Sequence, residues 1–281
     1  MFSQLPGRAM HTESKETDMV DVQLEDHIPS EEWPDVTKML EGFGDPSLPA
    51  SEALVGQKLD MSFTEGAKRS VEFLSANTLR FSSLDSPELI GEFAYRAVEA
   101  RPGIFYVDFL AGSGAHAHNM SFVYSTASGQ VTFADSYMYD KAGTIRTETD
   151  FAHGRVGEGE IKPRNRSNDL VGLRIYYRYS PTEHYEHIYL APGTFVWHCI
   201  KGGERGLADA DQTMAFELDD EILVFYWKET VMPVESFLVI DLKNKRSIGR
   251  MFCWDAPSMD LVHLPFDSEF TILNKTEYPT N

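Results

Sequence analysis

Residues 103–107, Gly-Ile-Phe-Tyr-Val, return at residues 221–225 as Glu-Ile-Leu-Val-Phe, and this repetition decides the fold. Two shorter matches keep the same order, namely Leu-Val-Gly at 54–56 with 170–172 and Ser-Phe-Val-Tyr at 121–124 with Ser-Phe-Leu-Val at 236–239. The copies are offset by 118, 116 and 115 residues, respectively. A period of this length indicates a duplicated domain, because the units of a solenoid are much shorter.

Each copy reads as a series of short strands. Runs rich in β-branched and aromatic residues alternate with turn signals, such as Arg-Pro-Gly at 101–103, Ser-Gly at 128–129 and Lys-Asn-Lys at 243–245. Such turns join antiparallel neighbours, and a row of antiparallel strands without intervening helices closes most simply into an up-and-down barrel. We therefore predict a mainly β fold of two tandem, lipocalin-like antiparallel up-and-down barrels, each around one cavity lined by alternate residues.

The repeat also predicts the domain boundaries. The chain has 281 residues, enough for two domains of ordinary size. Gly, Arg and Glu accumulate between the two copies, which indicates a linker there. The predicted segments are an acidic leader at 1–50, a first barrel at 51–140, a linker at 141–168 and a second barrel at 169–278.

One short helix is expected at the end of the acidic leader. Apolar residues recur at helical spacing over 33–43, and Gly42 and Gly44 supply a stop. Because the apolar stripe needs a cover, we expect the helix to pack across a barrel end or at the junction of the barrels. A lid over a functional site is the alternative. The residues of the stripe are Trp33, Val36, Met39, Leu40 and Phe43.

The composition limits the classes of partner and the cellular location that we expect for this protein. The formal net charge is −19, and residues 1–50 alone hold eleven acidic and three basic residues. Nucleic acids and anionic membranes are bound through basic patches, so neither is expected as a partner. The sequence shows no apolar run of ~18 residues and no signal peptide, and it has two cysteines, Cys199 and Cys253. These features predict a cytoplasmic protein without a disulfide framework.

Aromatic and ionisable side chains gather on one face of two neighbouring strands in the first copy. Alternate residues of 116–124 and of 133–139 form these faces, and we take both as pointing inward. A carboxylate, two imidazoles and several rings would then share one cavity, which suits acid–base chemistry. The candidates in this barrel are His116, His118, Asp135 and Tyr137 as catalytic residues, and Tyr106, Phe122, Tyr124 and Tyr139 as ligand-binding residues.

The second copy supplies further candidates. At an offset of 115 residues Arg250 stands where the first copy has Asp135, and a charge in each barrel points to function because an isolated charge is costly to bury. Lys228 and Glu229 lie on opposite faces of one strand, so only one of them can point inward. The candidates are Arg250 and Lys228 as catalytic residues, and Trp197, Tyr226, Trp227, Phe252 and Trp254 as ligand-binding residues.

Common cofactor motifs are missing from the sequence. His116 and His118 stand two apart, as two metal ligands on one strand would, but no third ligand follows at a diagnostic spacing. The sequence also lacks a Walker lysine loop, a dinucleotide-binding glycine motif and a Gly-x-Ser-x-Gly elbow. We therefore expect neither a metal nor an organic cofactor.

Several stretches resemble a known family. Residues 98–110, Val-Glu-Ala-Arg-Pro-Gly-Ile-Phe-Tyr-Val-Asp-Phe-Leu, are similar to the N-terminal half of the MoaF family, often labelled molybdenum cofactor biosynthesis protein F. The C-terminal half is similar at 195–199, 203–211, 226–229 and 239–243. The resemblance implies a pair of lipocalin-like barrels, in agreement with the repeat. It also implies an accessory role in molybdenum cofactor or monoamine metabolism.

Three functions remain open at this point. The first is an enzyme that acts on an apolar or aromatic metabolite by cofactor-free acid–base chemistry, as a lyase, isomerase or cyclase, in a barrel cavity. The alternative is a non-catalytic small-molecule binding protein, in which the polar groups only orient the ligand. The second alternative is the accessory role implied by the resemblance. The expected partner is a small apolar or aromatic metabolite, and a homodimer is left open.

Overall fold

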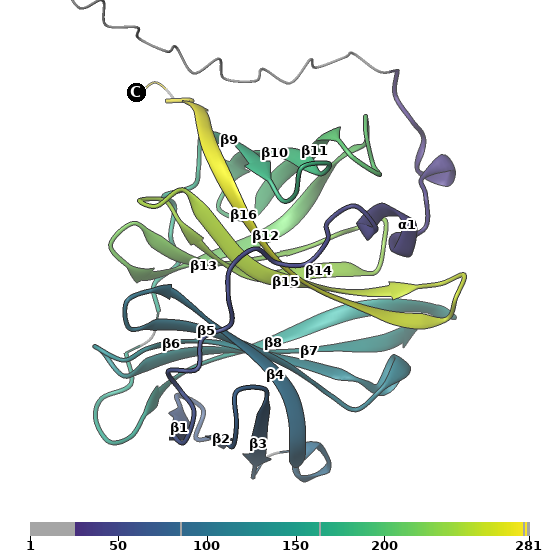
Figure 1. Ribbon diagram of the computed structural model, residues 1–281. Coiled ribbons are helices and arrows are strands. Elements are labelled where there is room, and N and C mark those ends of the chain that lie inside the picture. Colours follow the sequence, from purple (N-terminus) through teal and green to yellow (C-terminus); the bar gives the residue numbers. More distant parts are fainter. Residues whose placement is uncertain (1–25, 85, 163, 278, 280–281) are drawn as a thin grey trace, which may run out of the picture.

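The computed structural model describes residues 26–84, 86–162, 164–277 and 279. These residues form two closed eight-stranded antiparallel barrels, which lie one above the other in Figure 1. The prediction of a mainly β protein with two tandem up-and-down barrels is therefore confirmed. Residues 1–25 of the predicted acidic leader lie outside the described residues.

The first barrel follows the order of the chain. Each strand pairs with the next, and β8 returns to β1, where Gly154 lies opposite Phe63. A Cβ at Gly154 would come within 2.4 Å of the backbone oxygen of Ser62, so the close approach that completes this barrel requires glycine. The strands are β1 (Lys58–Phe63), β2 (Lys68–Phe73), β3 (Thr78–Ser83), β4 (Gly91–Arg101), β5 (Ile104–Ala111), β6 (His118–Ser125), β7 (Gln130–Lys141) and β8 (Thr144–Val156).

The second barrel repeats this order. It closes between β9 and β16, where Tyr177 lies opposite Phe270 and their rings are 5.1 Å apart. The strands are β9 (Leu173–Arg178), β10 (His184–Ala191), β11 (Thr194–Lys201), β12 (Ala208–Asp219), β13 (Ile222–Lys228), β14 (Val234–Asp241), β15 (Arg246–Asp255) and β16 (Asp260–Lys275).

Nearly half of the segment predicted as a linker, 141–168, is a strand, because β8 occupies residues 144–156. Ala142 and Gly143 both have positive φ, at 55° and 85°, which suits a tight hairpin between β7 and β8. Polar residues such as Thr147 and Thr149 fill buried positions of β8, so the strand does not show the apolar alternation that identified its neighbours. The connection between the barrels is reduced to 157–172.

The first residues of the two copies have the same structure. Leu54 and Leu170 are buried, and each is followed two residues later by a glycine with positive φ, 79° at Gly56 and 85° at Gly172. The N–H of Gly56 donates a 2.8 Å hydrogen bond to the carbonyl of Phe73 on β2. The N–H of Gly172 donates a hydrogen bond of the same length to the carbonyl of Tyr189 on β10. The duplication read from the sequence therefore extends to individual backbone contacts.

One of the three offsets used in the sequence comparison is misleading. At an offset of 116 Phe122 matches Leu238, and both lie in the cores of their own barrels, whereas the odd offset of 115 is one residue short and reverses the face. Phe122 accordingly lies in the first barrel's core, but Phe237, its partner at offset 115, points toward the other barrel. The placement of Arg250, Phe252 and Trp254 inside the second barrel used the odd offset and is wrong. Their inward neighbours on β15 are Met251 and Cys253.

The helix predicted over 33–43 is shorter in the structure. A 3-10 turn at Ser30–Glu32 (η1) precedes α1 at Val36–Leu40. Trp33 is extended, with φ −67° and ψ 142°, because the ring of Pro34 disfavours the helical region for the residue before it. The apolar stripe packs into the core of the second barrel, as expected for a helix at a barrel end, and Figure 1 shows α1 against this barrel.

The two barrels share a buried interface. Strands β13 and β14 are buried on both faces, except for the last residue of β13, whereas β1 of the first barrel alternates between buried and exposed residues. An apolar cluster occupies the interface and includes Tyr106 and Val123 from the first barrel and Val224, Phe237 and Val239 from the second. On this side of each barrel, one face of the strands packs in the barrel's own core, and the opposite face packs against the other barrel.

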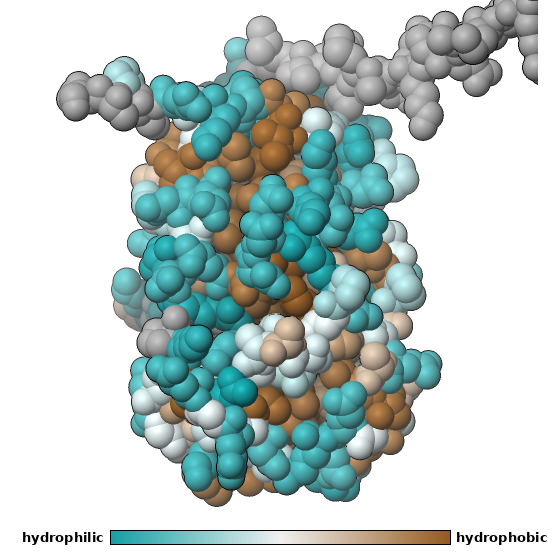
Figure 2. All heavy atoms as spheres, turned by 90° about the vertical axis from the view of Figure 1, so that its left-hand side faces the viewer, coloured by the Kyte–Doolittle hydropathy of each residue, from teal (hydrophilic) through white to brown (hydrophobic). Residues whose placement is uncertain are grey.

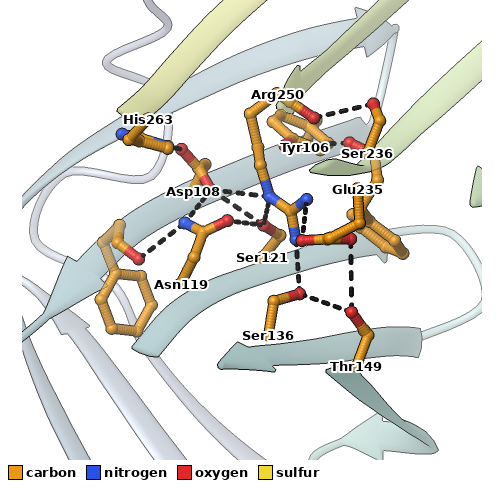
Figure 3. Close-up of polar contacts among 12 residues, drawn as sticks. Tyr106, Asp108, Asn119, Ser121, Ser136, Thr149, Glu235, Ser236, Arg250 and His263 are labelled. Atoms are coloured by element: carbon orange, nitrogen blue, oxygen red, sulfur yellow. Dashed lines mark hydrogen bonds and ion pairs between the residues drawn. The ribbon is translucent and has the colours of Figure 1, made fainter. Parts of the chain in front are cut away.

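Arg250 lies in this interface and not in a cavity (Figure 3). Its guanidinium is fully buried and donates to Glu235 at 2.6 Å, to Ser136 at 2.7 Å and to Ser121 at 3.1 Å. Asp108 of the first barrel lies 3.9 Å from the same group. The partners come from both barrels, so Arg250 joins the two domains. The prediction that placed Arg250 in the cavity of the second barrel is therefore wrong.

Hydrophilic residues cover most of the face shown in Figure 2, and hydrophobic residues show between them in patches. Among the residues that the structure describes, none belongs to a helix with the length and apolar character of a membrane span. Cys199 and Cys253 are both buried and free. The expectation that the chain carries no disulfide framework agrees with this observation.

Replacing Arg250 should be strongly destabilising. Arg250→Ala leaves Glu235 buried without its cation, and we expect the free energy of unfolding to fall by about 3–5 kcal/mol in urea titration. The double variant Arg250→Met with Glu235→Gln should lose less than the sum of the single changes. Arg80→Ala is the matched control, because this exposed arginine also contacts two carboxylates, Glu72 and Glu92, and should have a far smaller effect. Equal losses at positions 80 and 250 would contradict the role of Arg250.

Candidate functional site

A cleft of about 480 Å³ opens at one end of the first barrel. It lies where the β3–β4 connection, which contains the 3-10 turn η2 (Pro87–Leu89), meets the β5–β6 loop, which contains η3 (Gly114–His116). Apolar residues form much of its wall. Its lining residues include Leu89, Ile90, Phe93, His116, His118, Tyr137 and Met138.

Three of the predicted catalytic residues meet at this cleft. His118 begins β6 and Tyr137 lies opposite it on β7, so antiparallel pairing places their rings 5.4 Å apart. His116 reaches the cleft from η3 and not from a strand, which differs from the expectation of two histidines on one strand face. The structure thus brings these side chains together, and their catalytic role stays a prediction.

Asp135 completes the group. Its Oδ1 lies 2.8 Å from Nδ1 of His118, and both side chains are largely shielded from solvent. Burial, together with the carboxylates of Asp150 and Glu148, raises the pKa of Tyr137 above its ordinary value. At neutral pH, Tyr137 is therefore a proton donor at the cleft, beside an imidazole that a carboxylate orients.

Sequence analysis missed Arg69. This residue shares the inward face of β2 with Val71 and Phe73, and its guanidinium lies 4.3 Å from the centroid of the Phe133 ring, within the range of a cation–π contact. The alternation of β2 could have identified it. Arg69 places a positive charge near the same end of the barrel as His118.

The remaining first-barrel candidates lie away from the cleft. Phe122 and Tyr124 pack in the barrel core, where phenylalanine rings fill the interior that was expected to be hollow. Tyr106 lies in the inter-barrel cluster and donates a hydrogen bond to the carbonyl of Phe237. Tyr139 lies near Lys228, 5.9 Å from its ammonium group, at the boundary of the two barrels. The predicted ligand-binding roles of these four residues have no support in their positions.

Several second-barrel candidates face the first barrel. Lys228 pairs with Glu148 at 3.0 Å, across the barrel boundary. Tyr226 points the same way and contacts the ring of Phe151. Phe252 and Trp254 share the outward face of β15 with Arg250, for the reason of register given above. Trp197 and Trp227 do lie inside the second barrel, in its core cluster.

Carboxyl groups accumulate inside the second barrel. Glu204, Asp211 and Glu229 are all buried. Tyr185 donates to Glu204 at 2.6 Å, and the indole N–H of Trp197 donates to Asp211 at 2.9 Å. Burial raises the pKa of Glu204 to about 7 and that of Asp211 to about 6, and it raises the pKa of Glu229 well above its ordinary value. Glu229 is the inward member of the Lys228–Glu229 pair.

The same interior holds a neutral histidine. His187 is enclosed by aromatic rings, with Tyr177 at 4.5 Å, and burial lowers its pKa to about 3. The hydroxyl groups of Tyr177 and Tyr189 lie 2.8 Å apart, and Tyr189 is 3.4 Å from Nδ1 of His187. This group of side chains adds no positive charge to the carboxyl-rich interior.

Helix α1 covers these carboxyl groups. Beneath it lies a cavity of about 30 Å³, lined by residues of the helix segment and by barrel residues that include Glu204 and Glu229. In the part of the chain that the structure describes, no group of three or more His, Cys, Asp or Glu side chains has the arrangement of a metal site. The sequence placed Glu204 and Glu229 among the notable groups of the stretches that resemble the family, but it did not indicate that they lie together, because Glu204 comes from a loop.

The fold and these features define a tandem up-and-down β-barrel protein. The chain belongs to the MoaF family, as the resemblance predicted. Family models described as the MoaF N-terminal domain and the MoaF C-terminal domain match residues 31–140 and 164–276. Protein MoaF from Klebsiella aerogenes is similar to this chain, with 29% identity over 198 residues that cover 66% of this chain and 75% of the relative.

The stability of the protein should depend on pH through Glu204. Its folded pKa of about 7 lies above the ordinary value of 4.5, so between these values the folded protein binds more protons and loses stability as pH rises. We expect Glu204→Gln to raise Tm at pH 8 and to change it little at pH 5. Thermal unfolding from pH 5 to pH 8 measures this. A Tm difference that is the same at every pH would contradict the assignment, and Glu269→Gln is the exposed control on β16.

Proposed function

We propose that this protein binds a small, largely apolar metabolite at the mouth of the first barrel and catalyses a proton transfer on it. The reaction would be of the lyase, isomerase or cyclase type. The observation that supports this proposal is the 2.8 Å contact of His118 with Asp135 at a cleft that Tyr137 also lines. A base oriented by a carboxylate, with an acid across the cleft, is the arrangement that such chemistry needs.

The roles follow from the geometry. With Nδ1–H donated to Asp135, the basic nitrogen of His118 is Nε2, which would accept a proton from the substrate. Burial and neighbouring carboxylates raise the pKa of Tyr137, so it would stay protonated and donate a hydrogen bond to the oxygen on which charge develops. Leu89, Ile90 and Phe93 would contact the apolar part of the ligand. Positioned acids and bases of this kind contribute roughly 10²–10⁴-fold each.

Two alternatives lead to different expectations. In a non-catalytic binding protein the same polar groups only orient the ligand. An accessory role in molybdenum cofactor metabolism would need cations for a phosphate group, and the residues that line this cleft include neither Lys nor Arg. A role in monoamine metabolism concerns the pathway and is compatible with either activity. A cytoplasmic location and a homodimer stay predictions.

Deuterium exchange separates catalysis from binding. Apolar and aromatic carbonyl compounds that raise Tm in a thermal-shift screen are incubated with the protein in D₂O, and NMR follows deuterium incorporation at carbon. We expect His118→Ala and Asp135→Asn each to slow exchange at least 100-fold, because the oriented base is lost, while Kd changes by less than about threefold.

Tyr124→Phe is the control for this experiment, since Tyr124 lies at the other end of the same barrel and should leave exchange unchanged. If both cleft variants keep the full exchange rate, the catalytic roles of His118 and Asp135 are wrong. If they lose binding together with exchange, the binding-protein alternative replaces the catalytic one. The absence of any exchange in the wild-type protein, with binding retained, leads to the same conclusion.

A further inference from the structure

The carboxyl pair beneath α1 has no cation among its recorded contacts. Glu229 is 9% exposed, and its Oε2 has no hydrogen-bond partner in the part of the chain that the structure describes. Glu204 is 7% exposed and accepts a hydrogen bond from Tyr185. A buried carboxylate is costly unless a positive charge or several hydrogen bonds compensate it. Without such compensation, burial opposes ionisation and raises the pKa of both groups, and a cation between them would supply the missing charge.

Aromatic rings surround the same space. The cavity is lined by Trp227, Tyr179 and Tyr185 in addition to the two carboxyl groups. The faces of such rings carry negative partial charge and attract cations, most strongly where water is excluded. His187 also lines the cavity, and its lowered pKa keeps it neutral, so it does not repel a cation there.

The volume beneath α1 fits one small polar group. The cavity of about 30 Å³ is large enough for an ammonium group and too small for a whole organic ligand. The side chains of Met39, Leu40 and Phe43 fill the rest of the barrel mouth. Few polar contacts hold the helix segment in place; one is the 3.3 Å hydrogen bond from the Thr37 N–H to Asp255, and another joins Ser180 to the carbonyl of Gly42.

We propose that the second barrel contains a binding site for an organic ammonium ion. The ammonium group would lie between Glu204 and Glu229, against the rings of Trp227 and Tyr185. The apolar body of the ligand would take the place of the α1 side chains, which in the free protein close the mouth of the barrel. This site is separate from the first-barrel cleft and does not rest on the function proposed for that cleft.

Three compounds with the same ring and different charge test this site. Full-length protein is titrated by isothermal calorimetry at pH 8 with benzylamine, benzyl alcohol and benzoate. We expect benzylamine to bind at least tenfold more tightly than the other two. Glu229→Gln and Glu204→Gln, which keep the shape of the side chain, should each weaken benzylamine binding at least tenfold. Circular dichroism and Tm verify that these variants are folded.

Control variants locate the effect. Glu269→Gln removes an exposed carboxylate from the same barrel, and Glu72→Gln removes one from the first barrel; both should bind benzylamine as the wild type does. Leu40→Ser loosens the cover and should tighten benzylamine binding. Equal binding of the alcohol and the amine would overturn the proposal, as would unchanged affinity in both glutamine variants. Failure of benzylamine to bind both the wild type and Leu40→Ser would also overturn it.

Discussion

The packing of the two barrels against each other constrains the rest of the structure. A strand residue points to one of two sides, and on β13 and β14 both sides are buried. A charged residue on such a strand must therefore find its partners either in its own barrel or across the interface. Arg250, on the neighbouring strand β15, finds them on both sides, in Glu235 of its own barrel and in Ser121 and Ser136 of the other barrel. Its neighbour Asp108 has a pKa held below its ordinary value, although burial opposes ionisation, because His263, Arg250 and Asn119 compensate it.

The overall fold could be predicted from the sequence because strand alternation and turn residues are local signals. These signals predicted both barrels, whereas β8 was assigned to the linker. The polar side chains of Thr147 and Thr149 on β8 are buried against the other barrel, which a single strand's pattern does not indicate. The inward face of the second barrel was assigned partly from an odd offset, and one residue of error in register exchanges core and interface.

The first-barrel cleft and the second-barrel cavity differ in how far the sequence can reveal them. His118, Asp135 and Tyr137 lie on consecutive strands joined by a short turn, so their proximity follows from hairpin pairing. Glu204 comes from a loop, and its approach to Glu229 depends on the path of that loop and on the barrel's closure. No spacing along the chain encodes that arrangement. The two sites also differ in charge, since one pairs an imidazole with a carboxylate and the other collects carboxyl groups alone.

The segment that precedes the first barrel is needed to complete the second barrel. Residues that precede the first barrel cover the second: α1 closes its mouth, and Ser47 and Leu48 then bond to Asp267 on β16 before the carbonyl of Leu48 accepts a hydrogen bond from Arg96 on β4. The domains are therefore not interchangeable modules, although they repeat the same strand order. A second domain expressed alone would lack its cover, and during synthesis the leader must wait for the C-terminal barrel before it can dock.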